Sequence, residues 1–436
     1  MALGGGGYTT QNKKLPGAYI NFVSAASASA TLSDRGTVTI PLELDWGAED
    51  KVFTVTNSDF QKSSMKIFGY AYDSDKLKGL RDLFLSAQTL HAYRLNGGGE
   101  KAECDFATAK YGGSRGNDIK IVIQKNADDA ALYDVITYVD TAKVDSQTVV
   151  GAKSLVENDY VVFKNSATLE ATAGTPLVGG TNATVDGTAY QRYADLIESY
   201  SYNTMGVVST EDSIKKLFVA FCKRLRDEMG IKFQLVVYDC ADADYMGVIS
   251  VKNKTMDAGW SAASLVYWVT GAQAGCAVNK SCQNKKYDGE FDVNTQYTQT
   301  ELVAALDAGE FVLHSVNSDV RVLDDINTLV TTTDTVGDVF KDNQTVRVID
   351  QIGNDDAVLF NTKYLGVMPN NAAGRTSLWS DLVKLRQELQ DLGAIQNFTD
   401  SDVSVEEGDT KKAVVVNSAI EVVNAMGKLY MTVTVS

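Results

Sequence analysis

Few side chains of this sequence are spaced for catalysis. The 436 residues contain two histidines, His91 and His314, and each lies within a strand-like run, which predicts a structural role for both. No Gly-x-Ser-x-Gly elbow, no His-Glu-x-x-His zinc motif and no nucleotide-binding P-loop occur in the sequence. The acidic and glycine-rich stretches are therefore the remaining candidates for a binding or catalytic site.

Neither of these stretches has the spacing of the site it imitates. The glycine-rich loop at 111–119 precedes a strand, whereas a phosphate site would open a helix, so we predict a tight structural loop. Asp239, Asp242 and Asp244 imitate part of a calcium loop, but its glycine and its distal glutamate are absent, so we predict a solvated turn. We expect no cofactor, no metal site and no enzymatic activity.

Bulk composition excludes several other classes of protein. The formal net charge is -16 and the pI is near 4.7, which argues against a protein that binds nucleic acid or a membrane surface. No apolar run approaches the ~20 residues that span a bilayer, and the N-terminus lacks the apolar core of a signal peptide. The five cysteines lack zinc-knuckle spacing, and Cys222 lies on the apolar side of a helical pattern. These features indicate production in a reducing cytoplasm without export.

The elements that would position any site alternate between helix and strand. The clearest helix is expected at 213–229, where apolar residues recur at helical spacing, and Thr298 with Glu301 forms a capping box that opens another. Further helices are expected at 194–202, 346–361 and 380–392. Pro41 falls in a predicted strand and indicates an edge or a bulge. The strand at 413–418 is expected to pair with a strand at the C-terminus.

We predict a multidomain protein of mixed α+β and α/β class. The sequence pattern changes near residue 98, where short β-rich stretches begin to alternate with Gly, Asn, Asp and Thr turns. It changes again near residue 188, where helical and strand-like segments begin to alternate. The predicted parts are an N-terminal arm (1–22), an α+β part of the core (23–97), an inserted all-β domain (98–187), an α/β core domain (188–340), a C-terminal α+β domain (341–427) and a C-terminal strand arm (428–436).

Both ends of the chain are patterned to reach outward. At the C-terminus, Leu429, Met431, Val433 and Val435 alternate with Tyr430, Thr432 and Thr434, which is the period-2 pattern of a strand. At the N-terminus, four glycines at 4–7 form a loose tether before Tyr8. A terminal strand either closes its own sheet or adds to the edge of another molecule's sheet. The two ends together favour a subunit of a polymer.

A series of short segments, taken in order, carries a family resemblance. They lie at 15–20 (LPGAYI), 33–42, 111–119, 346–352, 364–371, 374–375, 393–395 and 422–435. Together with the two arms they make the chain resemble, from end to end, a contractile phage tail sheath protein of the kind found in myophages and in phage-tail-like bacteriocins of Gram-positive bacteria. The loop at 111–119 departs from the family's Pro-Gly-x-x-Gly-Asn-Asp-Ile pattern, because it lacks the proline.

The resemblance implies a structural homo-oligomer, assembled in the bacterial host cytoplasm as the tail sheath of a virion or a bacteriocin. Subunits would stack as rings or a helix around an inner tail tube protein, meet baseplate and tail terminator proteins, and contract to drive the tube through a cell envelope. The arms of neighbouring subunits would join a sheet in the C-terminal domain of a third. The intersubunit residues would be Tyr8, Leu15, Tyr19 and Ile20 in the N-terminal arm and Leu429, Tyr430, Met431, Val433 and Val435 in the C-terminal arm.

The same resemblance implies that the inserted domain faces outward and that the domain at 341–427 faces the tube. Lys384 and Arg386 would then be candidates to meet an acidic tube, with ordinary solvated helix charges as the alternative. Two other functions stay open. One is another self-assembling lattice, such as a surface-layer or capsid-associated protein, which would give flat sheets where a sheath gives tubes. The other is a hydrolase that uses the acidic clusters, which the scarcity of histidine opposes.

Overall fold

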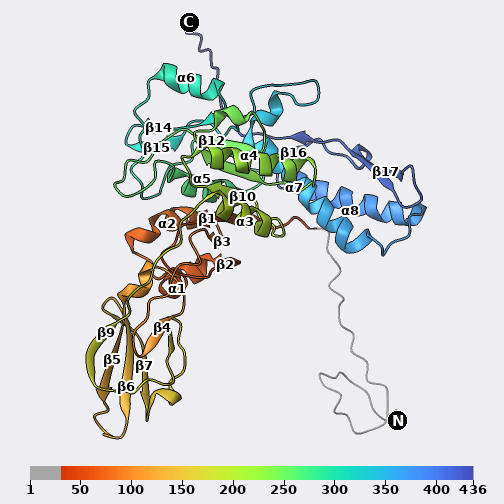
Figure 1. The fold of residues 1–436 in the computed structure, drawn as a ribbon. Coiled ribbons are helices and arrows are strands. Elements are labelled where there is room, and N and C mark those ends of the chain that lie inside the picture. The colour runs from red at the N-terminus through yellow and green to blue at the C-terminus, as the bar shows by residue number, and fades with distance from the viewer. Residues whose placement is uncertain (1–30, 436) are drawn as a thin grey trace, which may run out of the picture. The chain divides into compact units, whose positions relative to one another are not determined.

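A computed structural model describes residues 31–435, which fall into two units (Figure 1). The core unit comprises residues 34–353 and 422–435, and the C-terminal unit comprises residues 31–33 and 354–421. Helix α7 (Asn343–Leu359) begins in the first unit and ends in the second. The multidomain α and β class predicted from the sequence is confirmed.

A seven-stranded sheet organises the core unit. Its strand order is β13-β12-β11-β10-β1-β3-β2, and all neighbours are parallel except β2 and β3. Most of its inner strands are continuous runs of buried residues, as parallel strands covered on both faces require. The strands come from both sides of the β-rich insertion: β1 (Thr37–Leu42), β2 (Val52–Thr56), β3 (Thr89–Arg94), β10 (Thr204–Val207), β11 (Gln234–Tyr238), β12 (Val248–Val251) and β13 (Glu310–Phe311).

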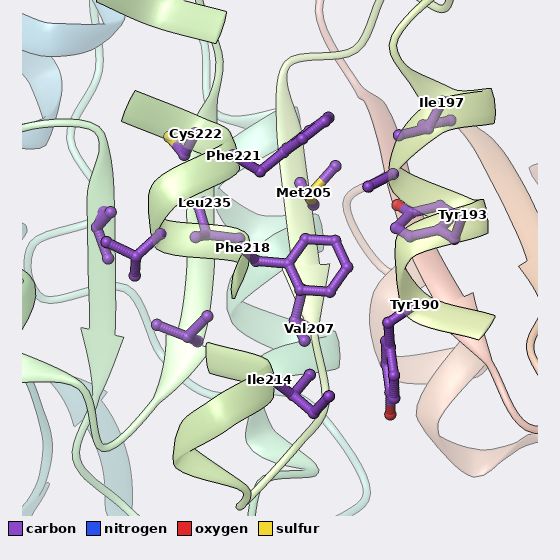
Figure 2. Packing of buried hydrophobic residues seen from close by; sticks show 14 of the residues in the cluster. Tyr190, Tyr193, Ile197, Met205, Val207, Ile214, Phe218, Phe221, Cys222 and Leu235 are labelled. Carbon is purple, nitrogen blue, oxygen red and sulfur yellow. The ribbon is translucent and has the colours of Figure 1, made fainter. Parts of the chain in front are cut away.

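Helices cover both faces of this sheet. Alternate residues of β11 belong to different clusters: Leu235 packs in the cluster that contains Phe218 of α4, while Val236 packs in the cluster that contains Trp268 of α5. In Figure 2, Phe218 lies against Met205 and Val207 of the sheet, and its ring centroid is 5.8 Å from that of Tyr193 in α3. The helices of this unit are α1 (Asn57–Phe68), α2 (Lys78–Phe84), α3 (Gly187–Ile197), α4 (Asp212–Asp227), α5 (Leu265–Gly275) and α6 (Gln299–Asp307). A hairpin of β14 (Leu313–Val316) and β15 (Asp319–Val322) follows them.

The insertion folds as a small all-β domain with its own core. Strands β4 and β8 form one sheet and β7-β6-β5-β9 form the other. Inward residues such as Ile121, Val135 and Phe163 are buried between them. The strands are β4 (Ala107–Ala109), β5 (Ile119–Lys125), β6 (Tyr133–Val139), β7 (Ala142–Val149), β8 (Val161–Phe163) and β9 (Thr172–Pro176).

The C-terminal unit is built on α8 (Ala372–Asp391). Asn371 caps this helix by accepting a hydrogen bond from Gly374 N, and Leu382, Leu385 and Leu389 form its buried stripe. A single π-helical turn (Phe360–Tyr364) precedes it. The strands that follow are β16 (Ile395–Gln396), β17 (Val403–Glu407), β18 (Val414–Ser418) and β19 (Glu421–Val422).

Several local predictions are corrected by tertiary context. Pro41 lies in an interior strand, but the pairing of β1 with β10 ends at Thr39, so the missing N–H of Pro41 removes no bond of that ladder. Helix α3 begins at Gly187, where Asp186 caps it, instead of at Ala194. Helix α8 likewise begins before Ser380. The residues at 413–418 pair with β17 and not with the C-terminal residues.

Candidate assembly surface

The C-terminal segment leaves the core unit from a fixed point. The buried side chain of Gln344, near the start of α7, donates to Val423 O at 3.0 Å and accepts from Ala425 N at 2.9 Å. Thr345 and Asn424 are hydrogen bonded beside it. The amide of Gln344 thus pairs with the backbone as a peptide unit of a neighbouring strand would, and it ties the chain down just before the alternating residues begin.

Beyond this point the apolar side chains are uncovered. Residues 423–435 form no strand, and no sheet in the described part of the chain includes them. Leu429 is 85% exposed and Val435 is 89% exposed, and Tyr430 on the other side of the alternation is 88% exposed. Met431 and Val433 are also exposed. A monomer therefore leaves this segment in water, at a cost of ~25 cal/mol for each Å² of apolar surface.

The predicted N-terminal contacts lie outside the described residues. Tyr8, Leu15, Tyr19 and Ile20 all precede residue 31. The first described residues bond to the C-terminal unit, because Ser33 Oγ donates to Asp355 Oδ1 at 2.6 Å and Leu32 N donates to Glu388 Oε2 at 3.1 Å.

The C-terminal unit carries a hairpin with open edges. Strands β17 and β18 pair from Val403 with Ser418 to Glu407 with Val414, and no third strand joins them among residues 31–435. Trp379 Nε1 of α8 donates to Val403 O at 2.9 Å, which anchors the β17 end. Val415 and Val416 of β18 are exposed. The solvent-exposed outer edge of a two-stranded sheet has backbone N–H and C=O groups that can hydrogen bond to another strand.

A groove lies in the same unit, between the turn at 364–370 and the loop before β18. Its volume is about 570 Å³. Val367 in its wall is 72% exposed, and Leu365 and Met368 are exposed beside it. Lys411 and Lys412 line it as well, so the groove is apolar with a basic border.

The two residues expected to face a tube differ in their surroundings. Lys384 is half exposed, and its Nζ lies 3.7 Å from Glu388 Oε1 on the same helix. Arg386 is buried, with its side chain 2% exposed, and its two terminal nitrogens donate to the carboxylate of Asp356 at 2.9 and 2.6 Å. This corrects the expectation for Arg386, because its charge is used inside the C-terminal unit.

The residues that imitate catalytic groups have structural partners. His91 Nδ1 lies 2.9 Å from Thr54 Oγ1, and burial lowers the pKa of His91 and of His314. Asp244 Oδ1 accepts from Val330 N and Thr331 N at 2.8 and 3.0 Å, so it holds a loop. Among the described residues, no group of three His, Cys, Asp or Glu side chains is placed to hold a metal ion.

The glycine-rich loop at 111–119 is the tight structural loop that the sequence predicted. Buried Arg115 donates to Gly69 O at 2.7 Å and to the carboxylate of Asp140, which joins the inserted domain to the core. Arg94, also buried, donates to Gly112 O at 2.8 Å. The loop's backbone is therefore used in internal contacts.

Sequence reasoning missed the β17–β18 hairpin and the groove. The alternation at 403–407 and the glycine at 408 are a strand-and-turn signal from which this hairpin could have been predicted. The groove had no local signal, since it forms where a π-helical turn meets a distant loop. Within residues 31–435, no helix combines the length and the apolar character needed to cross a membrane.

Four family models together match almost all of the chain. They are the phage tail sheath protein central domain (residues 183–328), the phage tail sheath C-terminal domain (335–436), the phage tail sheath protein beta-sandwich domain (96–182) and the tail sheath protein Gp18 domain III N-terminal region (35–95). The second of these models includes the exposed C-terminal segment.

Relatives match over nearly the full length. Phage-like element PBSX protein XkdK of Bacillus subtilis is 33% identical over 100% of both chains. The sheath tail protein of Desulfitobacterium hafniense is 40% identical, with a TM-score of 0.82 over 93% of this chain and 96% of that one. The sheath tail protein Lin1278 of Listeria innocua is 33% identical, with a TM-score of 0.77 over 90% and 93%. The contracted helical sheath of the anti-feeding prophage shares the fold at 12% identity, with a TM-score of 0.58 over 97% and 99%.

Proposed function

Because this chain belongs to the phage tail sheath protein family, it is a structural subunit of a contractile tail sheath, and we propose that its exposed C-terminal segment links one subunit to the next. The observation that carries this proposal is the run of uncovered, alternating apolar residues after Val423. Six large apolar side chains are exposed between Met426 and Val435, and contact with a second subunit would remove this apolar surface from water.

The segment would act by adding a strand to a neighbour's sheet. The outer edge of the β17–β18 hairpin is the acceptor that we favour, because it offers free backbone groups and exposed valines. Each main-chain hydrogen bond contributes ~1 kcal/mol net, and alternate side chains add ~25 cal/mol per Å² buried. One such link is modest, but links repeated along a tail resist dissociation together.

The remaining partners follow from the family. We propose that the N-terminal arm, with Tyr8, Leu15, Tyr19 and Ile20, makes a second link between subunits. Lys384 is the proposed contact to an acidic inner tube, since it is half exposed and lies on α8. Baseplate and tail terminator proteins would bind the two ends of the polymer, and contraction would drive the tube through a cell envelope.

Deletion of residues 428–436 tests the C-terminal link. The truncated chain should fold, because the described residues of this segment lie outside both cores, and it should form no tubes. Negative-stain electron microscopy and analytical ultracentrifugation measure the two outcomes. Normal tubes from the truncated chain would refute the proposal.

A matched pair of substitutions separates the two faces of the segment. Changing Leu429, Met431, Val433 and Val435 together to serine removes the apolar face and should abolish tubes. Changing Thr432 and Thr434 to serine leaves that face intact and should preserve the tubes. Equal loss of tube formation in both variants would show that assembly does not depend on the apolar face of the segment.

A further inference from the structure

Two of the five cysteines lie on one short loop of the core unit. Cys276 follows the last residue of α5, and Cys282 lies at the far end of the loop. Cys276 is partly exposed and Cys282 is buried. The first cause of the shifted pKa of each thiol is the other thiol, so the two sulfurs lie near each other. The loop therefore presents an accessible sulfur directly beside a protected one.

Two guanidinium groups surround Cys276. Arg35 Nε donates to the backbone oxygen of Cys276 at 2.9 Å. Arg347 Nη1 donates at 2.7 Å to Lys280 O, the same carbonyl that lies 3.4 Å from Cys276 Sγ. The Nε–H of Arg347 is buried and has no acceptor among the described residues. The positive charges of Arg35 and Arg347 would thus stabilise a thiolate at Cys276, and the Nε–H of Arg347 is available to donate to it.

The loop around Cys282 is held by a buried ion pair. Cys282 N donates to Asp325 Oδ2 at 2.8 Å, and Arg347 Nη2 donates to the same oxygen at 3.3 Å. Cys282 Sγ lies 3.6 Å from Ala272 O in α5. Arg347 and Asp325 therefore hold the loop at Lys280 and at Cys282, on the segment that joins the two cysteines.

We propose that Cys276 and Cys282 form a thiol–disulfide modification site, with Cys276 as the attacking thiol and Cys282 as the resolving one. The co-substrate is a small-molecule disulfide such as oxidised glutathione. This inference does not rest on the proposed function.

The reaction has two exchange steps. Cys276 thiolate attacks one sulfur of the small disulfide, whose S–S bond breaks and releases one small thiolate, leaving a mixed disulfide. Cys282 thiolate then attacks Cys276 Sγ, forms the Cys276–Cys282 bond and releases the second small thiolate. The two cysteine protons end on the two released thiols. The protein loses two electrons, and the small disulfide gains them.

The surroundings set the order of these steps. The hydrogen bond from Cys282, together with Arg347 and Arg35, lowers the pKa of Cys276 to about 7, against the opposing effects of burial and Asp325. The hydrogen bond to Cys276 and burial raise the pKa of Cys282. Because the thiolate is the nucleophile, Cys276 reacts first at neutral pH.

Treatment of the native, full-length protein with oxidised glutathione tests the site. The wild type should end lighter by about 2 Da, the mass of two hydrogens. Trypsin cuts after Lys280, between the two cysteines, so the product should be two peptides joined by a disulfide. Cys282→Ser should stop at an adduct of about 305 Da on Cys276. Cys276→Ser should form neither product at Cys282.

The matched control is Cys104→Ser, because Cys104 is also partly exposed but lies in the inserted domain. This variant should react at 276 and 282 as the wild type does. Adduct formation should have its midpoint near pH 7 in Cys282→Ser, where a hydroxyl still donates, and at higher pH in Cys282→Ala. Equal labelling of Cys276 and Cys104 in native protein, or a cross-link that appears only after denaturation, would overturn the proposal.

Discussion

Arg226 and Asp350 form a buried ion pair within the core unit, between α4 and α7. The two terminal nitrogens of Arg226 bond to the two carboxylate oxygens of Asp350 at 2.6 and 2.7 Å, and the side chains are 3% and 8% exposed. Asp350 raises the pKa of Arg226 against the opposing effect of burial, which lowers it. A charge held this way is stable only while its partner is present.

Removing one partner should therefore cost far more than removing both. We expect Asp350→Ala to lower the free energy of unfolding by about 3–5 kcal/mol, because it leaves a buried guanidinium unpaired. The double variant Arg226→Met with Asp350→Leu should recover most of this loss. Chemical denaturation followed by circular dichroism measures both.

The same helix offers a matched control. Arg224 Nη2 lies 2.7 Å from Glu198 Oε2, but this pair is 42% and 30% exposed. Glu198→Ala should cost at most about 1 kcal/mol, because water solvates the released charge. Similar losses for Asp350→Ala and Glu198→Ala would contradict the argument from burial.

At the scale of elements, the attachment of the inserted domain depends on one backbone conformation. Gly113 has φ +137°, and a Cβ there would lie 2.2 Å from Asp45 O. The neighbouring Gly112 bonds through its N–H to Glu49 at 2.6 Å and through its carbonyl to Arg94. A side chain at 113 would therefore displace a tightly bonded loop.

Gly113→Ala should lower the free energy of unfolding by about 3 kcal/mol or more, from backbone strain and from the clash together. Gly98→Ala is the control: its φ is +84°, but no atom lies within 4 Å of the added Cβ, so about 1 kcal/mol is expected. Thermal melting gives the ranking, and limited proteolysis shows whether the junction opens first. Equal melting temperatures for the two variants would rule out the clash.

The elements also show what local sequence can predict. The capping box of Thr298 and Glu301 is present, and the apolar spacing of α4 places Phe218 at 0% exposure, because both depend on neighbours within a few residues. The predicted pairing of the strand at 414–418 with the C-terminal residues is wrong, because this strand pairs with β17. The choice between two possible partner strands depends on tertiary contacts, which the pattern of one segment does not contain. Arg386 was misplaced for the same reason: its partner Asp356 lies far away in sequence.

The arms show the other limit of prediction. The alternation at 429–435 marks a segment suited to a strand, and in the described subunit that segment has no strand partner. A segment that pairs only with another molecule has the sequence pattern of a strand but no pairing partner within its own chain. Function could be read from the sequence because the ends and the order of segments identify the family, while the acceptor surface needed the folded C-terminal unit.

At the scale of the whole molecule, charge opposes assembly. Each subunit has a formal net charge of -16, and stacking identical subunits brings like charges together. The links proposed here consist of main-chain hydrogen bonds and apolar side chains, which salt screens little. Repulsion between subunits is screened, because the Debye length falls from about 30 Å at 0.01 M salt to about 8 Å at 0.15 M.

Raising the salt concentration should therefore favour polymerisation. Between about 0.01 M and 0.15 M sodium chloride, we expect the critical concentration for tube formation to fall several-fold, on the order of 1 kcal/mol per subunit added. Sedimentation of tubes at graded protein concentrations measures it, with sucrose of equal osmolarity as the control for excluded-solute effects. If salt instead dissolved the tubes, ion pairs between subunits would contribute more to the interface than the apolar face of the C-terminal segment does.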